Sequence, residues 1–111
     1  MNFDLRNYLN EKMDDLENQI KNKKSELLLL CEERQKISVI QKALLSHNIH
    51  DPETDSTMRD TNKKIEVIQK IIEDLTKKLN ALIHYYRTIE DVDLLNAEKN
   101  AIEKEYPIIY M

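Results

Sequence analysis

Apolar residues recur at alternating steps of four and three along the first half of the chain. They are Leu9, Met13, Leu16, Ile20, Leu27, Leu30, Ile37 and Leu44. This spacing is the seam of a heptad repeat, in which one stripe of an α-helix packs against a neighbouring helix. The other seam positions hold Lys23, Arg34 and Gln41. Polar residues there weaken a seam and fix its register. The pattern predicts a first helix over about residues 3–47, with Asn2 or Asp4 as its N-cap.

Polar residues mark where the first helix ends and the second begins. Because the chain has no glycine, Asn48 is the best candidate for the left-handed residue that closes a helix. The Asp-Pro-Glu sequence at residues 51–53 combines an N-cap with proline at the first helical position, which signals a helix start. Thr57 offers a rival start further on. The sequence therefore predicts a polar turn over about residues 48–56.

The second helix carries the most regular pattern in the chain. Ten consecutive seam positions hold no charge: Met58, Thr61, Ile65, Ile68, Ile72, Leu75, Leu79, Leu82, Tyr86 and Ile89. Val67, Ile71 and Ile83 flank this seam and widen its apolar face. The pattern predicts a second helix over about residues 57–89, with Pro52 as its earliest start. A face this wide is more than one neighbouring helix can cover.

The regular seam fails after Ile89. The next apolar residues are Val92, Leu95, Ile102 and Tyr106, which are offset by a three-residue step. Such a step overwinds a coiled coil or breaks its helix. The sequence therefore predicts a kink, or a separate short helix over about residues 91–105. Pro107 ends this helix, and residues 106–111 form a short apolar tail.

These elements predict an all-α fold in a single domain of 111 residues: a long antiparallel helical hairpin (coiled coil) with a short C-terminal third helix and an apolar tail. Two helices alone bury only a narrow strip, while ordering the backbone costs roughly 1–2 kcal/mol per residue. We therefore expect the hairpin to gain burial from a protein partner. That partner is a second copy, in a dimer that forms a four-helix bundle, or a different helical protein in an obligate complex.

The composition excludes several classes of protein. Glycine-dependent turns of β-meanders, Rossmann folds and P-loops are ruled out because glycine is absent. A net charge of -4 with interspersed signs argues against a nucleic-acid partner. No apolar run approaches the roughly 18 residues of a membrane span, and no apolar leader opens the chain. We expect a soluble cytoplasmic protein with no membrane partner, although export without a cleavable signal stays open.

Candidate catalytic and metal-binding groups are sparse. His47 and His50 lie three apart near two aspartates, which is a spacing that a divalent metal can use, but a polar helix end explains it equally simply. Cys31 lies within a run of leucines, where a thiol is inert. No serine has the glycine-framed turn that an oxyanion hole needs. We therefore expect no enzyme activity, cofactor, metal or small-molecule substrate.

Tyrosine and arginine gather where the seam breaks, and tyrosine recurs in the tail. The candidate protein-binding residues are Tyr85, Tyr86, Arg87, Ile89, Tyr106, Ile108, Ile109 and Tyr110. Rings beside basic residues also suit single-stranded nucleic acid, but the acidic residues Glu90, Asp91 and Asp93 follow at once. A protein-binding hot spot, which favours Tyr and Arg, is the better interpretation. The tail either docks on a partner or packs back on the hairpin.

The segment from Tyr86 to Glu90 reads Tyr-Arg-Thr-Ile-Glu. It resembles the Tyr-x-x-x-Asp/Glu signal that follows the second helix of small helical-hairpin proteins exported by the type VII pathway. Those proteins carry a Trp-x-Gly turn, and this chain has neither Trp nor Gly, although partner proteins of the pathway can lack that turn. The leading prediction is a non-catalytic interaction module or adaptor. The alternative is a small regulator, inhibitor or secretion partner (phage-type, antitoxin-like or type VII-like) that caps a larger target through its second helix and tail.

Overall fold

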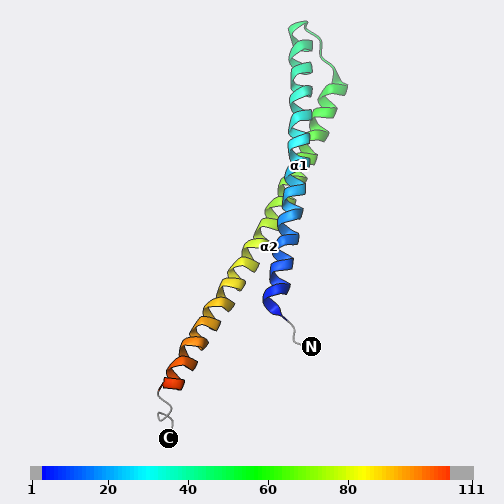
Figure 1. Ribbon diagram of the computed structural model, residues 1–111. Helices are drawn as coiled ribbons and strands as arrows, with labels where there is room; N and C mark the ends of the chain where they lie inside the picture. The colour runs from blue at the N-terminus through cyan, green and yellow to red at the C-terminus, as the bar shows by residue number, and fades with distance from the viewer. Residues whose placement is uncertain (1–3, 106–111) are drawn as a thin grey trace.

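The computed structural model describes residues 4–105, with side chains described for residues 4–89. It consists of two long helices, α1 (Leu5–Ser46) and α2 (Pro52–Glu105), which run antiparallel and pack against each other (Figure 1). The molecule measures 92 × 28 × 15 Å and has a radius of gyration of 26.2 Å. A compact chain of this length has a radius of about 13 Å. The predicted all-α helical hairpin is confirmed, and it is highly extended.

Side-chain and backbone caps define both ends of α1. At its start, the Asp4 carboxylate accepts hydrogen bonds from the backbone N–H groups of Arg6 at 3.1 Å and Asn7 at 3.2 Å. Asp4 is therefore the N-cap, one of the two residues predicted for that role. The cap satisfies N–H groups that have no partner within the helix.

The end of α1 is a Schellman motif centred on Asn48. This residue has a φ of 58°, the left-handed conformation that glycine usually supplies and asparagine tolerates. Its N–H donates to the Leu45 carbonyl, and the Ile49 N–H donates to the Leu44 carbonyl, both at 2.9 Å. The predicted C-cap is confirmed, and the chain turns sharply here without glycine.

The second helix begins at Pro52 rather than at about residue 57. The Asp51 carboxylate accepts the Glu53 N–H at 3.1 Å and the Thr54 hydroxyl at 2.6 Å, so it caps α2 as proline opens it. With this cap in place, the rival start at Thr57 is not used. Its hydroxyl instead donates to the Glu53 carbonyl within the helix, at 2.9 Å. The turn is thus shorter than the predicted 48–56.

The α2 cap should make stability depend on pH. The Thr54 hydroxyl and the Glu53 N–H hold the pKa of the Asp51 carboxyl below its usual value. The stabilisation is therefore complete above the ordinary aspartate pKa of about 3.9 and is lost as the pH falls through the lowered value. We expect the wild type to melt higher than Asp51→Asn at pH 7, and this advantage to vanish at about pH 2. A melting-temperature difference that stays constant between these pH values would contradict the assignment.

The predicted seams form the contact between the helices. All ten seam positions of α2 are buried or half-buried, and Thr61 and Ile65 are the most buried of them. On α1, Leu9, Ile20 and Ile37 are buried, and Arg34 is the only exposed seam residue. The heptad pattern therefore identified the packed face of both helices.

The polar seam residues escape unpaired burial in three ways. Lys23 pairs with Glu26 on its own helix at 3.2 Å. The Gln41 amide donates to the Asp55 carboxylate of α2 at 3.0 Å, which ties the two helices together near the turn. Arg34 is exposed, so its charge stays in water. This agrees with the expectation that none of the three lies buried without a partner.

Replacing Arg34 by leucine should raise the free energy of unfolding by about 1 kcal/mol, because leucine fits the apolar seam that arginine avoids. It should also loosen the register, because a polar seam residue discriminates against shifted pairings. Thermal unfolding measures the first effect, and the number of oligomeric species in sedimentation velocity measures the second. A clear loss of stability would mean that Arg34 has a specific partner.

The register follows from residues that line the same grooves. Leu30 of α1 lies beside Val67 and Ile68 of α2, and Ile40 lies near Thr57. Both helices rise equally per residue, so the start of α1, 25 residues before Leu30, lies level with about residue 93 of α2. α2 has 54 residues against 42 in α1, so it projects beyond α1 at the end away from the turn (Figure 1).

The predicted break after Ile89 is not seen. α2 runs without interruption to Glu105, in place of a separate third helix over residues 91–105. The reason lies in the local sequence, which has no proline before Pro107 and is rich in Leu, Ala, Glu and Lys. A three-residue offset rotates the apolar stripe around the helix axis without requiring the backbone to break. The predicted tail, residues 106–111, lies outside the described part of the chain.

Candidate protein-binding surface

The hairpin exposes far more surface than a compact protein. Its accessible area is 9225 Å2, whereas a compact monomer of its 13.2 kDa exposes about 6,400 Å2. Much of the excess is apolar. The exposed large apolar side chains are Tyr8, Leu28, Leu29, Val39, Ile40, Leu45, Ile49, Val67 and Tyr85. Apolar surface of this kind marks sites of protein association.

Five of these nine side chains share one long face. In a heptad written abcdefg with a and d on the seam, Tyr8, Leu29 and Val67 take c positions, while Ile40 and Tyr85 take g positions. In an antiparallel pair, the g positions of both helices border the same side of the seam, and the c positions lie just outside them. We call this side the c/g face. Leu28, Val39 and Leu45 take other positions, and Ile49 lies in the turn.

The middle of the c/g face is its most apolar part. Leu30, Lys63, Lys64, Val67 and Ile68 line a shallow groove between the two helices. Val67 is 59% exposed there, and Leu29, next to Leu30, is 65% exposed. Both lysines belong to α2, so charged side chains border the apolar groove on the α2 side. This arrangement matches the apolar core and polar rim of a protein interface.

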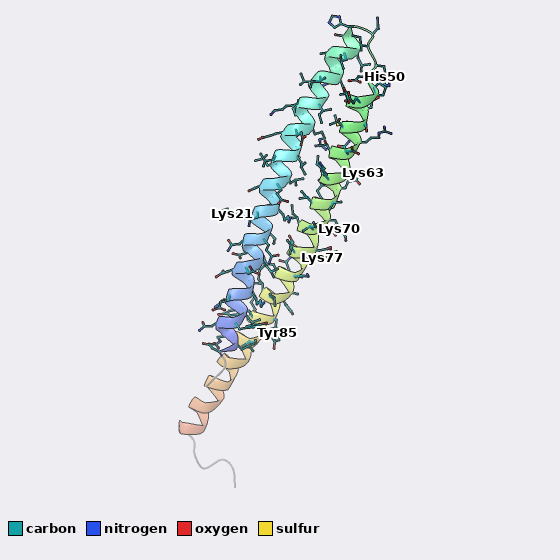
Figure 2. The ribbon with its side chains drawn as sticks, turned by 90° about the vertical axis from the view of Figure 1, so that its right-hand side faces the viewer. Lys21, His50, Lys63, Lys70, Lys77 and Tyr85 are labelled. Carbon is teal, nitrogen blue, oxygen red and sulfur yellow. The ribbon has the colours of Figure 1, made fainter. Side chains whose placement is uncertain are left out.

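The end of the c/g face near the start of α1 is aromatic. Tyr85 of α2 is half-exposed and lies where α1 begins (Figure 2). On α1, the Lys12 ammonium lies 5.6 Å from the centre of the Tyr8 ring, within cation–π range. Counting from Leu30 beside Val67, Lys12 falls at the same level as Tyr85, since each is 18 residues away. Rings from both helices thus occupy this end.

The structure describes four of the predicted binding residues, and these four do not share one surface. Tyr86 and Ile89 are half-buried on the seam, so they hold the hairpin together. Tyr85 and Arg87 are exposed, but they point in different directions because two residues on a helix are about 200° apart. The remaining four, Tyr106, Ile108, Ile109 and Tyr110, lie outside the described residues. Among the predicted residues that the structure describes, only Tyr85 lies on the c/g face.

Sequence reasoning missed the middle of this face. The sequence pattern places Val67 beside the seam, but it leaves Leu29 within the run of leucines that precedes Cys31. The available signal was the heptad itself, because apolar residues at c and g positions have no place in a two-stranded coil. The heptad positions show that Leu29 and Val67 lie outside the seam. Placing them side by side also requires knowing which residues of the two helices lie level with each other.

The turn holds the other polar cluster considered from the sequence. The His50 imidazole lies 3.1 Å from the Asp55 carboxylate; the His50 side chain is largely exposed, and Asp55 is half-buried. Figure 2 shows His50 beside the turn. Gln41, Leu44, Leu45 and Ile49 line a small groove beside them. Within residues 4–89, no three His, Cys, Asp or Glu side chains converge as metal ligands would. The groups near the turn act as caps and surface pairs.

The remaining chemical groups are far apart along the hairpin. Cys31 is a half-buried free thiol in the middle of α1, whereas His84 lies near the opposite end of the molecule from His47 and His50. The Tyr-Arg-Thr-Ile-Glu segment lies inside α2 rather than after it. Over the described residues, neither helix is apolar enough along 18 positions to cross a membrane.

Comparisons of the chain with protein-family models, with curated proteins and with solved structures found no match. The c/g face, with Leu29 and Val67 at its centre and Tyr85 at one end, is therefore identified from the geometry of the hairpin.

Proposed function

We propose that this chain is a non-catalytic protein-interaction module, which self-associates or forms an obligate complex with another helical protein. The observation that carries the proposal is the c/g face, where five of the nine exposed large apolar side chains gather. A hairpin that worked alone would be expected to place polar residues there, as it does at most other outward positions.

The thin core supports the same proposal. Buried apolar residues within the described side chains are limited to Leu9, Ile20, Ile37 and Ile65, and no side chain is fully buried. Covering the c/g face with another helical surface would bury the exposed residues and bring Leu30, Ile68 and Ile71 deeper into a shared core. Each square ångström of apolar surface removed from water contributes about 25 cal/mol. A partner therefore adds stability that the hairpin lacks.

The proposal is tested by thermal unfolding of the purified chain over a hundredfold range of concentration, followed by circular dichroism. We expect the melting temperature to rise with concentration, because assembly stabilises the folded chain by mass action. A partly helical chain without cooperative unfolding would fit the version with a different protein partner. Cooperative unfolding at a melting temperature independent of concentration would overturn the proposal.

A second candidate is the capping of a larger target by the far end of α2. The observation that favours it is the projection of α2 beyond α1, which leaves a single helix at that end (Figure 1). A small regulator, inhibitor or secretion partner would use this helix with Tyr85 and the tail. In this role the hairpin supports the projecting end of α2, which contacts the target.

Deleting residues 107–111 separates the two roles of the tail. If the tail docks on a target, the truncated chain should keep its helicity and melting temperature but lose about 2 kcal/mol or more of binding free energy, the scale of a hot-spot anchor. If the tail packs on the hairpin, the melting temperature should fall and binding should follow the folded fraction. Calorimetric titration with a partner purified from the source, beside circular dichroism, measures both.

A further inference from the structure

We propose that the c/g face binds a second copy of this chain, with the two hairpins aligned in parallel so that both turns lie at the same end. The inference rests on the proposed function and names its partner. The two-fold axis runs along the hairpin, so α1 of each copy packs on α2 of the other. Every neighbouring pair of helices in the resulting four-helix bundle is antiparallel, as in common bundles of this kind.

The face has the size that a stable dimer needs. From Tyr8 to Ile40 it spans 32 residues, or about 48 Å of helix, and two adjacent helices are about 20 Å wide. The footprint is therefore about 900 Å2 per copy, or about 1,800 Å2 in total, within the range of stable interfaces. The hairpin exposes more surface than a compact protein of its mass, and this excess is larger than the footprint on one copy. One such interface can therefore be formed from the excess surface alone.

Apolar residues match across the parallel dimer. Residues of α1 and α2 at the same level in one hairpin meet the equivalent residues of the other copy, because the axis leaves the level unchanged. Leu29 and Leu30 therefore meet Val67, which lines the central groove together with Leu30. At the aromatic end, the Tyr8 ring and Lys12 meet Tyr85.

Charges match as well. Counting from Leu30 beside Val67, Glu33 meets Lys64 three residues further on, and Lys36 meets Asp60 about one turn beyond. All four of these side chains are exposed. Among the described residues, none of them makes an ion pair within its own hairpin. Opposite charges are thus available to flank the apolar centre, where they set orientation.

The opposite alignment, with the turns at opposite ends, fits poorly. It packs α2 on α2, and centring it on Val67 puts Asp60 of one copy level with Asp74 of the other, since each is seven residues from the centre. Like charges that face each other across an interface are destabilising. Tyr85 would also move away from the Tyr8 ring and Lys12 of the other copy, because the aromatic ends of the two faces would lie far apart. The sequence of charges therefore selects the parallel alignment.

Adjacent leucines provide a matched pair of variants. Leu29 and Leu28 are exposed to nearly the same extent, 65% and 61%, but only Leu29 lies on the c/g face. We expect Leu29→Glu to raise the dimer dissociation constant by at least about 30-fold, the effect of losing a hot-spot residue. Leu28→Glu should change it by less than about threefold. Sedimentation equilibrium measures both, and circular dichroism checks that each variant keeps its helices.

The alignment is read from the distance between the two turns. A spin label attached to His50→Cys, in a Cys31→Ser background, marks each turn. Parallel copies place the labels about 10–30 Å apart, as neighbours across one bundle end. The opposite alignment places them about 50 Å apart, twice the 17 residues of helix between His50 and Val67. Pulsed electron–electron double resonance measures the distance between the two spin labels and distinguishes these alignments.

The outcomes separate this inference from the proposed function. A dimer that is lost in Leu29→Glu, kept in Leu28→Glu and labelled at the short distance supports the parallel dimer. A dimer that is lost in Leu28→Glu but kept in Leu29→Glu, or one with labels about 50 Å apart, overturns the parallel dimer but not the proposed function. A partly helical monomer also overturns the parallel dimer but not the proposed function, because it favours a complex with a different protein. A cooperatively folded monomer overturns both.

Discussion

Replacing Ile65 by alanine should lower the free energy of unfolding by about 2–4 kcal/mol. Ile65 is only 3% exposed and lies on the uncharged seam of α2. The substitution removes buried methyl and methylene groups and leaves a cavity that two straight helices cannot close. Because so few residues are buried, this loss is a large part of the total stability. Chemical denaturation, with the wild type at the same chain concentration, measures it.

Val39→Ala is the matched control for this prediction. Val39 is also a β-branched residue in the middle of a helix, but it is 57% exposed and lies opposite the seam. Its replacement should change stability by no more than about 0.5 kcal/mol. Equal effects of the two substitutions would show that the seam does not carry the stability of the hairpin.

Replacing Glu90 by proline should disrupt the last third of α2. In a continuous helix, proline removes the hydrogen bond from residue 90 to the carbonyl of Tyr86, and its ring clashes with that carbonyl, at a cost of about 3 kcal/mol. The chain either accepts this cost or loses helix beyond residue 89. Circular dichroism should therefore report a lower melting temperature, or a loss of up to about one sixth of the helical signal.

The same substitution tests the alternative that the sequence suggested. If a new helix began after Thr88, residue 90 would lie in its first turn, where proline is tolerated because the N–H has no helical partner. Glu90→Pro would then match a Glu90→Ala control in both helicity and melting temperature. That result would restore the short third helix over residues 91–105.

The two seams could be predicted from the sequence because each depends on only one helix. An uncharged run at alternating spacings of three and four, such as the one from Met58 to Ile89, has only one way to be buried in an α-helix. The helix caps at Asp4 and Asn48 could be predicted for the same reason, because their hydrogen bonds join residues two to five positions apart. The seams and the caps thus depend on residues that are close together in the sequence.

The c/g face could not be predicted because it depends on the register between helices. The sequence left the start of α2 open between Pro52 and Met58, and a shift of five residues changes which side chains of α1 and α2 lie together. The Asp51 cap fixes the start of α2 at Pro52. In the folded hairpin, Leu30 then lies beside Val67. In the predicted cluster around Tyr86, the seam residues Tyr86 and Ile89 are half-buried within the hairpin, which the sequence pattern alone did not separate from the exposed Tyr85.

The helix break was predicted on a pattern that has two physical outcomes. A three-residue offset in the apolar stripe either breaks a helix or rotates the stripe around it. The backbone of residues 90–105 takes the second course, and that segment contains neither glycine nor proline, the residues that most oppose a helix. The spacing of the apolar residues alone does not distinguish the two outcomes.

Sedimentation equilibrium of the wild-type chain beside Leu29→Glu tests the central claim most directly, since both are measured at one concentration and under one set of conditions. The wild type should sediment with about twice the 13.2 kDa chain mass, and Leu29→Glu should shift toward the single-chain mass. A wild-type chain that sediments at 13.2 kDa and unfolds cooperatively would show that the c/g face binds no second copy and that the hairpin is stable alone.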